Sequence, residues 1–312
     1  MTEYIPWTEK YRPKKYDSIL LDNNNRKLFN NILKYNNFPN LLFHGPPGIG
    51  KTTTIINLIK RYQTLNNNKS DLQIIHLNAS DERGVDIIRN NIYNFVNSDN
   101  LFLSGIKFVI LDEVDYMTKI AQQALKSLIQ EFNVNIRYCL ICNYISKIDY
   151  SLQYEFIKIR FNTLPKEYLN NYLKNIIVNE NINIKNDKNN INKIIDYFNY
   201  DIRSMINFIQ SNTINKINKI NIIENSILEK LYNFNTDKSL QLFVNKIINI
   251  EKIYNIDKNT IIKKYIFYIL NNKLNLINSD IITELEYIIH NLYNIDNNDI
   301  TIKYVYYIIL NN

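Results

Sequence analysis

Glycine is scarce in this sequence, at five of 312 residues. Glycine permits backbone conformations and close approaches that a Cβ obstructs, so a chain with so little of it keeps it where the backbone requires it. Gly45, Gly48, Gly50 and Gly84 fall within two short stretches that resemble motifs, and only Gly105 lies elsewhere. We therefore expect both stretches to be functional.

Other absences exclude whole classes of protein. The two cysteines, Cys139 and Cys142, share one apolar stretch and have no second Cys or His pair to complete a metal site, so we expect reduced core thiols. No apolar run approaches the ~20 residues of a membrane span. The first residues carry acids and a proline where a signal peptide needs an apolar region. We expect a soluble protein of a reducing compartment, with no membrane partner.

Length and charge set broad limits. At 312 residues the chain is long enough for two or three domains, each with its own core. A net charge of +7 and an isoelectric point near 9.0 suit a polyanionic partner. The lysines are spread along the chain, so charge alone does not establish nucleic-acid binding. Asn, Ile, Lys and Tyr are abundant, as in proteins from AT-rich genomes, and we interpret the Asn runs as solvated surface.

The hydrophobic pattern divides the chain. Short apolar runs alternate with helical stretches up to residue 161, which predicts an α/β domain with a buried parallel sheet. We expect strands at 40–44, 73–77, 107–111, 138–142 and 157–161, with helices at 52–62, 86–96 and 121–132. After Pro165 the pattern is helical, starting with 166–178, 191–200 and 202–211. The predicted domains are 1–161, 162–225 and 226–312, and no Pro/Gly linker marks the second boundary.

A glycine-rich loop follows the first predicted strand and opens a helix, as a P-loop requires. Its amides and the helix N-terminus would face phosphate oxygens, Lys51 would reach the β- and γ-phosphates, and the Thr52 hydroxyl would bind Mg²⁺. A chance Gly/Pro turn is the alternative, which the complete match disfavours. The loop residues expected to contact the nucleotide are Gly45, Pro46, Pro47, Gly48, Ile49, Gly50, Lys51, Thr52 and Thr53.

Two carboxylates end the predicted strand at 107–111, where sites open in α/β folds. We expect Asp112 to hold Mg²⁺ through water and Glu113 to orient and polarise the attacking water. Alone, acids at a strand end are as often solvated side chains. Because a P-loop precedes them, we favour a catalytic role for these acids over solvated side chains, and the sequence therefore predicts an ATP·Mg²⁺ site.

Other polar residues remain ambiguous on the pattern alone. Asn143 ends the next strand and either contacts the γ-phosphate or closes a turn. Arg203 starts a later helix, where arginines are usually solvated. Arg83 and Arg89, around a predicted helix start, suit a phosphate backbone, but Ser80 or Asp81 also explains that start as an N-cap.

Several stretches together resemble the small subunits of the replication factor C clamp loader, which are AAA+ ATPases. They are PWTEKYRP at 6–13, PNLLFHGPPGIGKTTT at 39–54, LNASDERGVDIIRN at 77–90, KFVILDEVDYMTKIAQQAL at 107–125 and RYCLICNYISKI at 137–148, with a weaker match at 201–210. The resemblance implies an AAA+ domain, a helical lid and an all-α C-terminal collar. It also implies a subunit of a five-membered ring that uses ATP to open a sliding clamp and place it on primer-template DNA. The reducing, AT-rich, eukaryote-like character of the chain suggests a nuclear location, although no clear basic import signal is visible.

The resemblance also implies roles for single residues. Tyr11, Arg12 and Pro13 match the segment near the adenine, Asn143 matches the family's sensor and Arg203 its lid arginine. Arg83, Arg89 and Lys119 match the helix starts that track DNA, and the C-terminal helices match the collar that holds the ring together. The catalytic set is then Lys51, Glu113, Asn143 and Arg203.

One departure bears on activity. Where the family has Ser-Arg-Cys, supplying an arginine finger to a neighbour's ATP, this chain has Tyr154, Glu155 and Phe156. Such a finger accelerates hydrolysis about 10³- to 10⁵-fold. We therefore expect this subunit to use its own ATP site without completing its neighbour's. An alternative is an assembly subunit in which ATP is a structural ligand; a different P-loop machine such as a helicase is disfavoured by the family-specific stretches.

Overall fold

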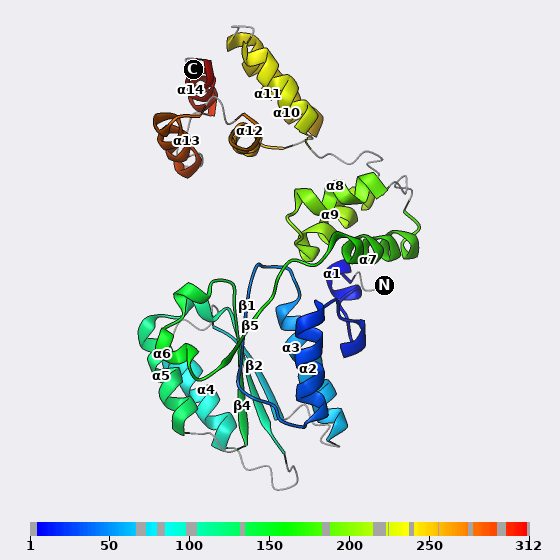
Figure 1. Ribbon diagram of the computed structural model, residues 1–312, viewed down its shortest axis with the longest axis vertical. Coiled ribbons are helices and arrows are strands. Elements are labelled where there is room, and N and C mark those ends of the chain that lie inside the picture. Colours follow the sequence, from blue (N-terminus) through cyan, green and yellow to red (C-terminus); the bar gives the residue numbers. More distant parts are fainter. Residues whose placement is uncertain are drawn as a thin grey trace. The chain divides into compact units, whose positions relative to one another are not determined.

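The protein is described here from a computed structural model, shown in Figure 1. The structure describes residues 5–66, 73–79, 85–97, 105–131, 135–182, 188–214, 223, 225–236, 240–254, 256–273, 277–291 and 298–310. Contacts divide the chain into two compact units, Met1–Asn218 and Lys219–Asn312. The three-domain division remains a prediction, because these contacts separate two units and leave most of the predicted small helical domain within the first.

Five parallel strands form one sheet in the described part of the first unit. They are β1 (Leu41–His44), β2 (Ile74–Asn78), β3 (Lys107–Asp112), β4 (Ile136–Cys142) and β5 (Ile157–Arg160), side by side in the order β2-β3-β4-β1-β5. Leu41, Leu42 and Phe43 are at most 1% exposed, as in a parallel sheet with both faces covered. The predicted α/β class and its five strands are confirmed.

The strand order brings separate loops together. β4 lies between β1 and β3, with Leu41 beside Cys139 and Leu111 beside Leu140. Because all strands run the same way, the segments that follow β1, β3 and β4 leave the sheet at one edge. That edge therefore carries the loop at 45–50, Asp112 and Asn143.

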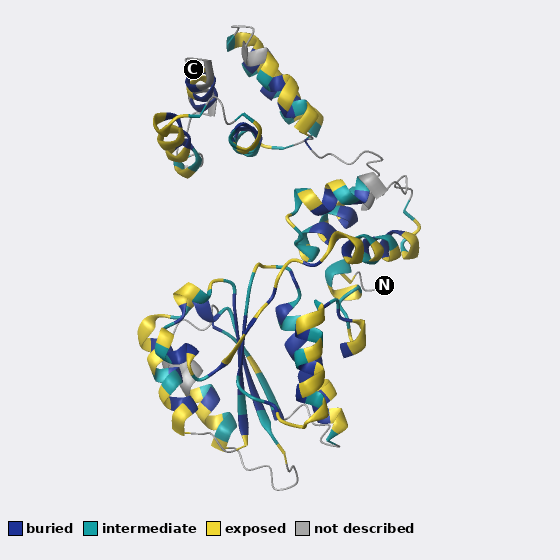
Figure 2. Cartoon of the chain, viewed as in Figure 1, coloured by how far each residue is buried: buried dark blue, intermediate teal, exposed yellow. Residues whose placement is uncertain are grey.

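Helices cover both faces of the sheet. On one side lie α2 (Asn23–Lys34) and α3 (Lys51–Leu65), and on the other α4 (Val85–Asn97), α5 (Lys119–Glu131) and the short α6 (Tyr150–Gln153), as Figure 1 shows. Figure 2 shows buried strands between helices whose outer faces are exposed. α2 was not predicted from its Asn-rich sequence. It begins where the Asp22 carboxylate accepts hydrogen bonds from the amides of Asn24 (3.1 Å) and Asn25 (2.9 Å) and packs Phe29 and Ile32 into the core.

Three further helices complete the first unit. α7 (Lys166–Asn179), α8 (Lys188–Tyr197) and α9 (Ile202–Ile214) match the predicted helical stretches, and we call them the lid helices. Their contacts bury Leu169, Leu173 and Met205. Short helical turns α1 (Trp7–Lys10), η1 (Tyr16–Ser18), η3 (Val114–Tyr116) and η4 (Ile145–Lys147) connect the longer elements.

The second unit is helical in its described residues. It consists of α10 (Asn225–Thr236), α11 (Leu240–Tyr254), α12 (Lys258–Asn272), α13 (Ser279–Asn291) and α14 (Asn298–Leu310) around a core that includes Phe243, Ile261 and Tyr265. This confirms the predicted helical character of the C-terminal region. None of the described helices combines the length and apolar character that crossing a lipid bilayer requires.

Candidate nucleotide-binding site

A pocket lies at the edge of the sheet where β1, β3 and β4 end. Its walls come from the N-terminal segment, the glycine-rich loop, the strand ends and the lid helices. The predicted site residues that line it are Arg12, Pro13, Pro47, Gly48, Ile49, Gly50, Lys51, Thr52, Thr53, Asp112, Glu113, Asn143 and Arg203. It is also lined by Thr8, Glu9, Ile19, Leu20, Tyr172, Ile202 and Ile206, which were not predicted. The pocket therefore brings together residues from both ends of the first unit.

Two glycines of the loop are required by close approaches. A Cβ at Gly45, where φ is 145°, would lie 2.3 Å from the Phe161 carbonyl oxygen. A Cβ at Gly48, where φ is 69°, would lie 1.7 Å from an oxygen of Asp201. The loop thus packs closely against Phe161, which follows β5, and against the start of α9, which explains why a glycine-poor chain retains glycine here.

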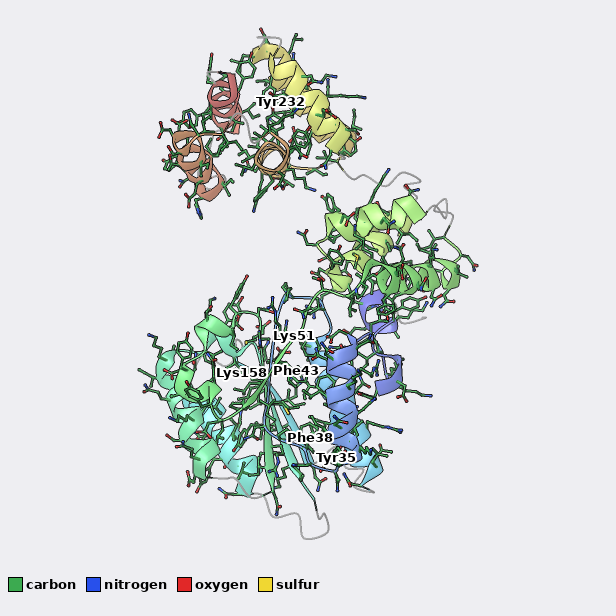
Figure 3. The ribbon with its side chains drawn as sticks, in the orientation of Figure 1. Tyr35, Phe38, Phe43, Lys51, Lys158 and Tyr232 are labelled. Atoms are coloured by element: carbon green, nitrogen blue, oxygen red, sulfur yellow. The ribbon has the colours of Figure 1, made fainter. Side chains whose placement is uncertain are left out.

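Lys51 is the first residue of α3 and is only 7% exposed. It lies just past the carboxyl end of β1, near Phe43 in Figure 3. Its ammonium donates hydrogen bonds to the carbonyl oxygens of Gly45 and Pro46, both at 2.8 Å, and to Asn143 Oδ1 at 2.9 Å. Burial lowers the pKa of Lys51, while Asp112 opposes the shift. The ammonium is therefore held at the loop by three oxygen acceptors, which a phosphate would have to replace.

Thr52 and Asp112 offer oxygen ligands for a metal ion. Thr52 Oγ1 donates to Asp112 Oδ2 at 2.6 Å, and Asp112 Oδ1 accepts from the Glu113 amide at 2.9 Å. A hydroxyl beside a carboxylate fits Mg²⁺, which prefers oxygen and keeps several waters. Among the described residues no group of three or more His, Cys, Asp or Glu side chains could hold a metal by itself. Any Mg²⁺ here would therefore also depend on phosphate and water oxygens.

Glu113 has an uncommon backbone conformation. Its φ of 56° and ψ of 37° are left-handed, which costs free energy for a residue with a Cβ. It turns the chain from β3 into η3 and lines the pocket. Left-handed residues of this kind concentrate at functional sites, because the surrounding structure must hold them in place.

Asp115 holds the backbone of Asn143 in place through hydrogen bonds. Its carboxylate is 6% exposed, and Oδ2 accepts from the amides of Asn143 (3.4 Å) and Tyr144 (3.3 Å). The turn after β4 is thereby tied to the turn after β3. Asp115 was not predicted as a site residue, because no spacing rule marks an acid that acts on a neighbouring strand's backbone.

The start of α9 rests on the loop. The Ile202 amide donates to the Gly48 carbonyl at 3.2 Å. Asp201 accepts from the Ser204 amide at 3.1 Å and from the Ser204 hydroxyl at 2.9 Å, which caps the helix. This capped start places Arg203 at the pocket, on the lid side.

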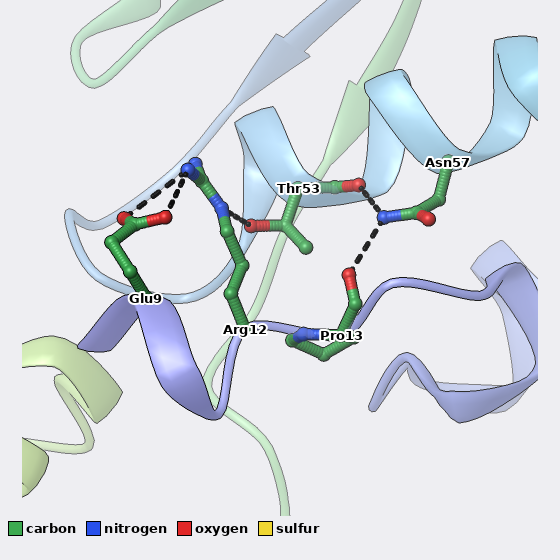
Figure 4. Close-up of polar contacts among 5 residues, drawn as sticks. All are labelled: Glu9, Arg12, Pro13, Thr53 and Asn57. Carbon is green, nitrogen blue, oxygen red and sulfur yellow. Dashed lines mark hydrogen bonds and ion pairs between the residues drawn. The ribbon is translucent and has the colours of Figure 1, made fainter. Parts of the chain in front are cut away.

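The N-terminal segment lies against α3, as Figure 4 shows. Arg12 Nε donates to Thr53 Oγ1 at 3.2 Å, and Arg12 Nη1 pairs with Glu9 at 3.2 Å. Asn57 Nδ2 donates to the carbonyl oxygens of Pro13 (3.0 Å) and Thr53 (2.8 Å). Arg12 and Pro13 are therefore anchored next to the P-loop helix.

Tyr11 is turned towards the lid helices. Its hydroxyl donates to Glu180 at 2.5 Å, Lys10 pairs with the same carboxylate at 2.5 Å, and the Tyr172 hydroxyl donates to the Tyr11 carbonyl at 2.9 Å. Burial and the hydrogen bond to Glu180 raise the pKa of Tyr11 to about 12. Nearby, the Trp7 amide donates to Gln210 at 3.1 Å. We call the contacts of Trp7, Lys10 and Tyr11 with these helices the N-terminal strap.

Three of the predicted nucleotide contacts do not line the pocket: Tyr11, Gly45 and Pro46. Tyr11 faces Glu180 instead, while Gly45 and Pro46 act through carbonyl oxygens that accept from Lys51. The strap partners Tyr172, Glu180 and Gln210 were not predicted, because no local pattern marks a hydrogen bond between residues so far apart in the chain.

Of the three predicted DNA contacts, Lys119 does not line the pocket, and the side chains of the other two lie outside the described residues. Lys119 is the first residue of α5 and is exposed. Arg83 and the side chain of Arg89 lie outside the described residues. Glu155, at the expected arginine-finger position, accepts a hydrogen bond from Gln130 Nε2 at 2.8 Å.

Comparison with known proteins adds a family. Residues 41–163 match the model of the ATPase family associated with various cellular activities (AAA). The chain is 36% identical over 209 residues to replication factor C subunit 3 of Saccharomyces cerevisiae, covering 67% of this chain and 60% of that protein. It is 34% identical over 253 residues to the probable replication factor C subunit 5 of Dictyostelium discoideum, covering 79% and 70%. For replication factor C subunit 5 of Homo sapiens the identity is 37%, covering 66% and 60%.

Solved structures agree on the fold. The RuvB Holliday junction branch migration motor of Thermotoga maritima matches with a TM-score of 0.52 and 17% identity, covering 84% of this chain and 91% of that one. At this identity the likeness concerns the fold alone. The matched part of the chain spans about 60% of the length of the yeast and human relatives.

Proposed function

This chain belongs to the replication factor C family of AAA ATPases, and we propose that it is an ATP-dependent small subunit of a clamp loader. In this role it joins other loader subunits in a hetero-pentamer, opens a sliding clamp and places it on primer-template DNA during replication in the nucleus. The observation that carries the proposal is the convergence of Lys51, Thr52, Asp112, Glu113 and Asn143 on one pocket, facing Arg203.

The phosphate end of the pocket is arranged for a polyphosphate. Amides at the start of α3 and the ammonium of Lys51 supply the positive potential. Lys51 is now held by two carbonyls and by Asn143, and these hydrogen bonds can be exchanged for phosphate oxygens. Thr52 and Asp112 would hold Mg²⁺, which neutralises phosphate charge when bound.

Hydrolysis in this proposal is divided among three side chains. Glu113 orients and polarises the attacking water from its turn after β3. Asn143, fixed by Asp115 and in contact with Lys51, acts as the sensor of the terminal phosphate. Arg203 offsets the charge that develops on the phosphoryl group from the lid side.

The pocket also offers apolar surface for a nucleobase. Pro13, Ile19, Leu20, Ile202 and Ile206 line it and give a surface of the kind that holds an aromatic ring. Arg12 and Pro13 both line the pocket, which supports their proposed role near the adenine. Because Ile202 and Ile206 come from α9, base binding would join the lid helices to the α/β domain.

The alternative keeps ATP as a structural ligand of an assembly subunit. Its support is Glu155, which bonds to Gln130 and cannot stabilise the negative charge of a neighbour's transition state. This concerns only the neighbour's site, however, whereas the residues that this chain contributes to its own site, Lys51, Thr52, Asp112, Glu113, Asn143 and Arg203, all line the pocket. We therefore favour hydrolysis and propose that the finger in this subunit's own site comes from a neighbour.

The test is Glu113→Gln, compared with Glu131→Gln, an exposed acid at the end of α5. We expect the Kd of Glu113→Gln for ATP to stay within about threefold of the wild-type value, while the assembled ring loses the ATP hydrolysis of this site.

The ring is purified by pull-down with the other loader subunits and the clamp, with and without ATP, and its DNA-stimulated rate of ATP hydrolysis is measured. A Glu113→Gln ring that still loads clamps at the wild-type rate would establish the structural alternative, and a chain that never joins a ring would refute both.

A further inference from the structure

Away from the pocket, two exposed tyrosines flank a lysine on the surface of the first unit. Lys147 Nζ lies 5.4 Å from the ring centroid of Tyr116 and 5.2 Å from that of Tyr144. The two tyrosines are 61% and 59% exposed, so most of each ring is accessible to a ligand. We call Tyr116, Tyr144 and Lys147 the tyrosine–lysine platform.

The backbone beneath this platform is fixed by buried side chains. Gln122, which is 1% exposed, donates to the carbonyl oxygens of Met117 (3.2 Å) and Lys147 (3.1 Å) and so joins η3 to η4. Asp115 accepts from the Tyr144 amide, as described above. The rings are therefore mounted on a preorganised surface, which reduces the entropy lost when a ligand binds.

The platform's own segments carry two exposed lysines. Its two segments, 114–120 and 143–148, contain Lys119, Lys147 and a single carboxylate, Asp115. That carboxylate is buried and faces backbone amides. Lys119 and Lys147 therefore supply positive charge for a phosphate backbone, while the bordering acids Glu113 and Asp149 lie outside these segments.

This combination favours a nucleic-acid strand over a protein. Aromatic rings interleaved with lysines bind single strands, because bases stack on the rings and phosphates meet the ammonium groups. Protein interfaces also use tyrosine, but lysine is depleted there, whereas Lys147 lies between the two rings. Base pairing hides the faces on which stacking depends, so the favoured ligand is an unpaired strand.

We propose that the tyrosine–lysine platform binds unpaired nucleotides, with bases stacked on Tyr116 and Tyr144 and phosphates on Lys147 and Lys119. This proposal depends on the proposed function only for the premise that the chain binds DNA. Tyr144 directly follows Asn143, and Tyr116 lies three residues after Glu113. A bound strand would thus lie beside the turns that carry two residues of the nucleotide site.

The test measures the anisotropy of fluorescein-labelled oligothymidylate, about 20 nucleotides long, and of a duplex of equal length, with the full chain at fixed salt. We expect the double variant Tyr116→Ala, Tyr144→Ala to raise the Kd for the single strand about tenfold or more, and that for the duplex less than twofold. The double Phe variant should retain single-strand binding, because stacking needs the ring and not the hydroxyl.

Tyr35→Ala is the matched control. Tyr35 is 69% exposed and has Lys34 Nζ 5.4 Å from its ring centroid, but it lies at the end of α2. It is expected to leave both affinities unchanged. ATP binding by each variant checks folding, and cross-linking of a bromodeoxyuridine-substituted strand to the wild type, mapped by mass spectrometry, should identify Tyr116 or Tyr144.

Several outcomes would overturn the inference. They are an unchanged single-strand affinity in the double Ala variant, an equal loss for both ligands, or cross-links that map elsewhere. Loss of ring assembly with single-strand affinity intact would assign the platform to a protein contact. A chain that binds ATP but no single strand refutes this inference alone, whereas one that binds the strand but not ATP refutes the proposed function alone.

Discussion

The two sides of the nucleotide pocket are built differently. On the phosphate side, Lys51, Thr52, Asp112 and Asn143 contact one another because parallel strands end at one edge of a sheet. On the lid side, the N-terminal strap joins residues such as Trp7 and Gln210, which are 203 positions apart. The phosphate side supplies charge at fixed positions, while the strap sets how firmly the lid helices are held. Substitutions on the first side should abolish binding, and those on the second should tune stability.

The largest effect is expected for Lys51→Ala. Removing the ammonium deletes the charge nearest the proposed phosphates and frees two loop carbonyls and Asn143 from their donor. Charged hydrogen bonds contribute about 1.5–3 kcal/mol each, so the Kd for ATP should rise at least about 100-fold. Isothermal titration calorimetry measures it.

Lys60→Ala, on the exposed side of the same helix, is the control and should bind ATP like the wild type. If Lys51→Ala bound ATP within about threefold of the control, the phosphate side would not be where the nucleotide is held. The distinction between a phosphate side that binds the nucleotide and a lid side that tunes stability would then be wrong.

Local patterns explain why much of the phosphate side could be predicted. Lys51 follows a glycine-rich loop, and Asp112 ends an apolar strand, so their chemistry could be inferred without knowing the sheet order. Asn143 also ends an apolar strand, but its role stayed open until the family resemblance was considered. Arg203 was predicted only through the family resemblance, since an arginine at a helix start has no distinctive pattern. All four line the pocket.

The lid side was largely missed, and the reason is physical. Glu180 meets Lys10 and Tyr11 across about 170 residues, and a single carboxylate at a helix end carries no periodic signal. Tyr11 was expected near the base through the family resemblance, and its hydroxyl donates to Glu180. The close approach of Asp201 to Gly48 could not be predicted either, because this contact forms only when α9 packs against the loop.

Gly48→Ala tests the contact between the glycine-rich loop and the start of α9. The added methyl would lie 1.7 Å from an oxygen of Asp201, so either the Asp201 side chain must shift and give up its hydrogen bonds to Ser204, or the start of α9 must move away from the loop. Gly50→Ala is a close control, since φ is also positive at Gly50, at 88°, but no atom lies within 4 Å of the added Cβ. We expect Gly48→Ala to weaken ATP binding about tenfold more than Gly50→Ala, by calorimetry. Equal losses would mean that backbone strain, rather than the lid contact, governs the loop.

Glu180→Gln tests the strap, with Glu167→Gln on the same helix as the control. Burial raises the pKa of Glu180, but hydrogen bonds from Lys10 and Tyr11 outweigh it and the net shift is downward. A depressed pKa stabilises the folded state above the unfolded pKa near 4.5, and this stabilisation is lost as pH falls through the folded value. The variant should therefore be less stable by about 1–2 kcal/mol at pH 7 and should approach the wild type below about pH 4.

Trp7 offers a direct measurement of that effect. It is the single tryptophan of the chain and lies within the strap, so its emission during urea unfolding reports the first unit. A deficit that stayed constant from pH 7 down to about pH 3, below the range in which the carboxylate takes up its proton, would show that the carboxylate charge is not what stabilises the strap. Glu167→Gln should unfold at the same urea concentration as the wild type at pH 7, because that side chain is exposed.

The smallest effect is expected at the turn before α9. Asn199 and Tyr200 have φ values of 48° and 67°, so two successive residues with a Cβ adopt the left-handed conformation ahead of Asp201. Glycine removes this strain, which is about 1–2 kcal/mol for an ordinary residue, but it adds entropy to the unfolded chain. Tyr200→Gly should therefore stabilise the first unit by less than about 1 kcal/mol in urea unfolding, and Asn199→Gly by less still, because Asn tolerates this conformation. Destabilisation by Tyr200→Gly would mean that the tyrosine ring contributes more to the lid than its backbone costs, and the lid side would then depend on packing as well as on the strap.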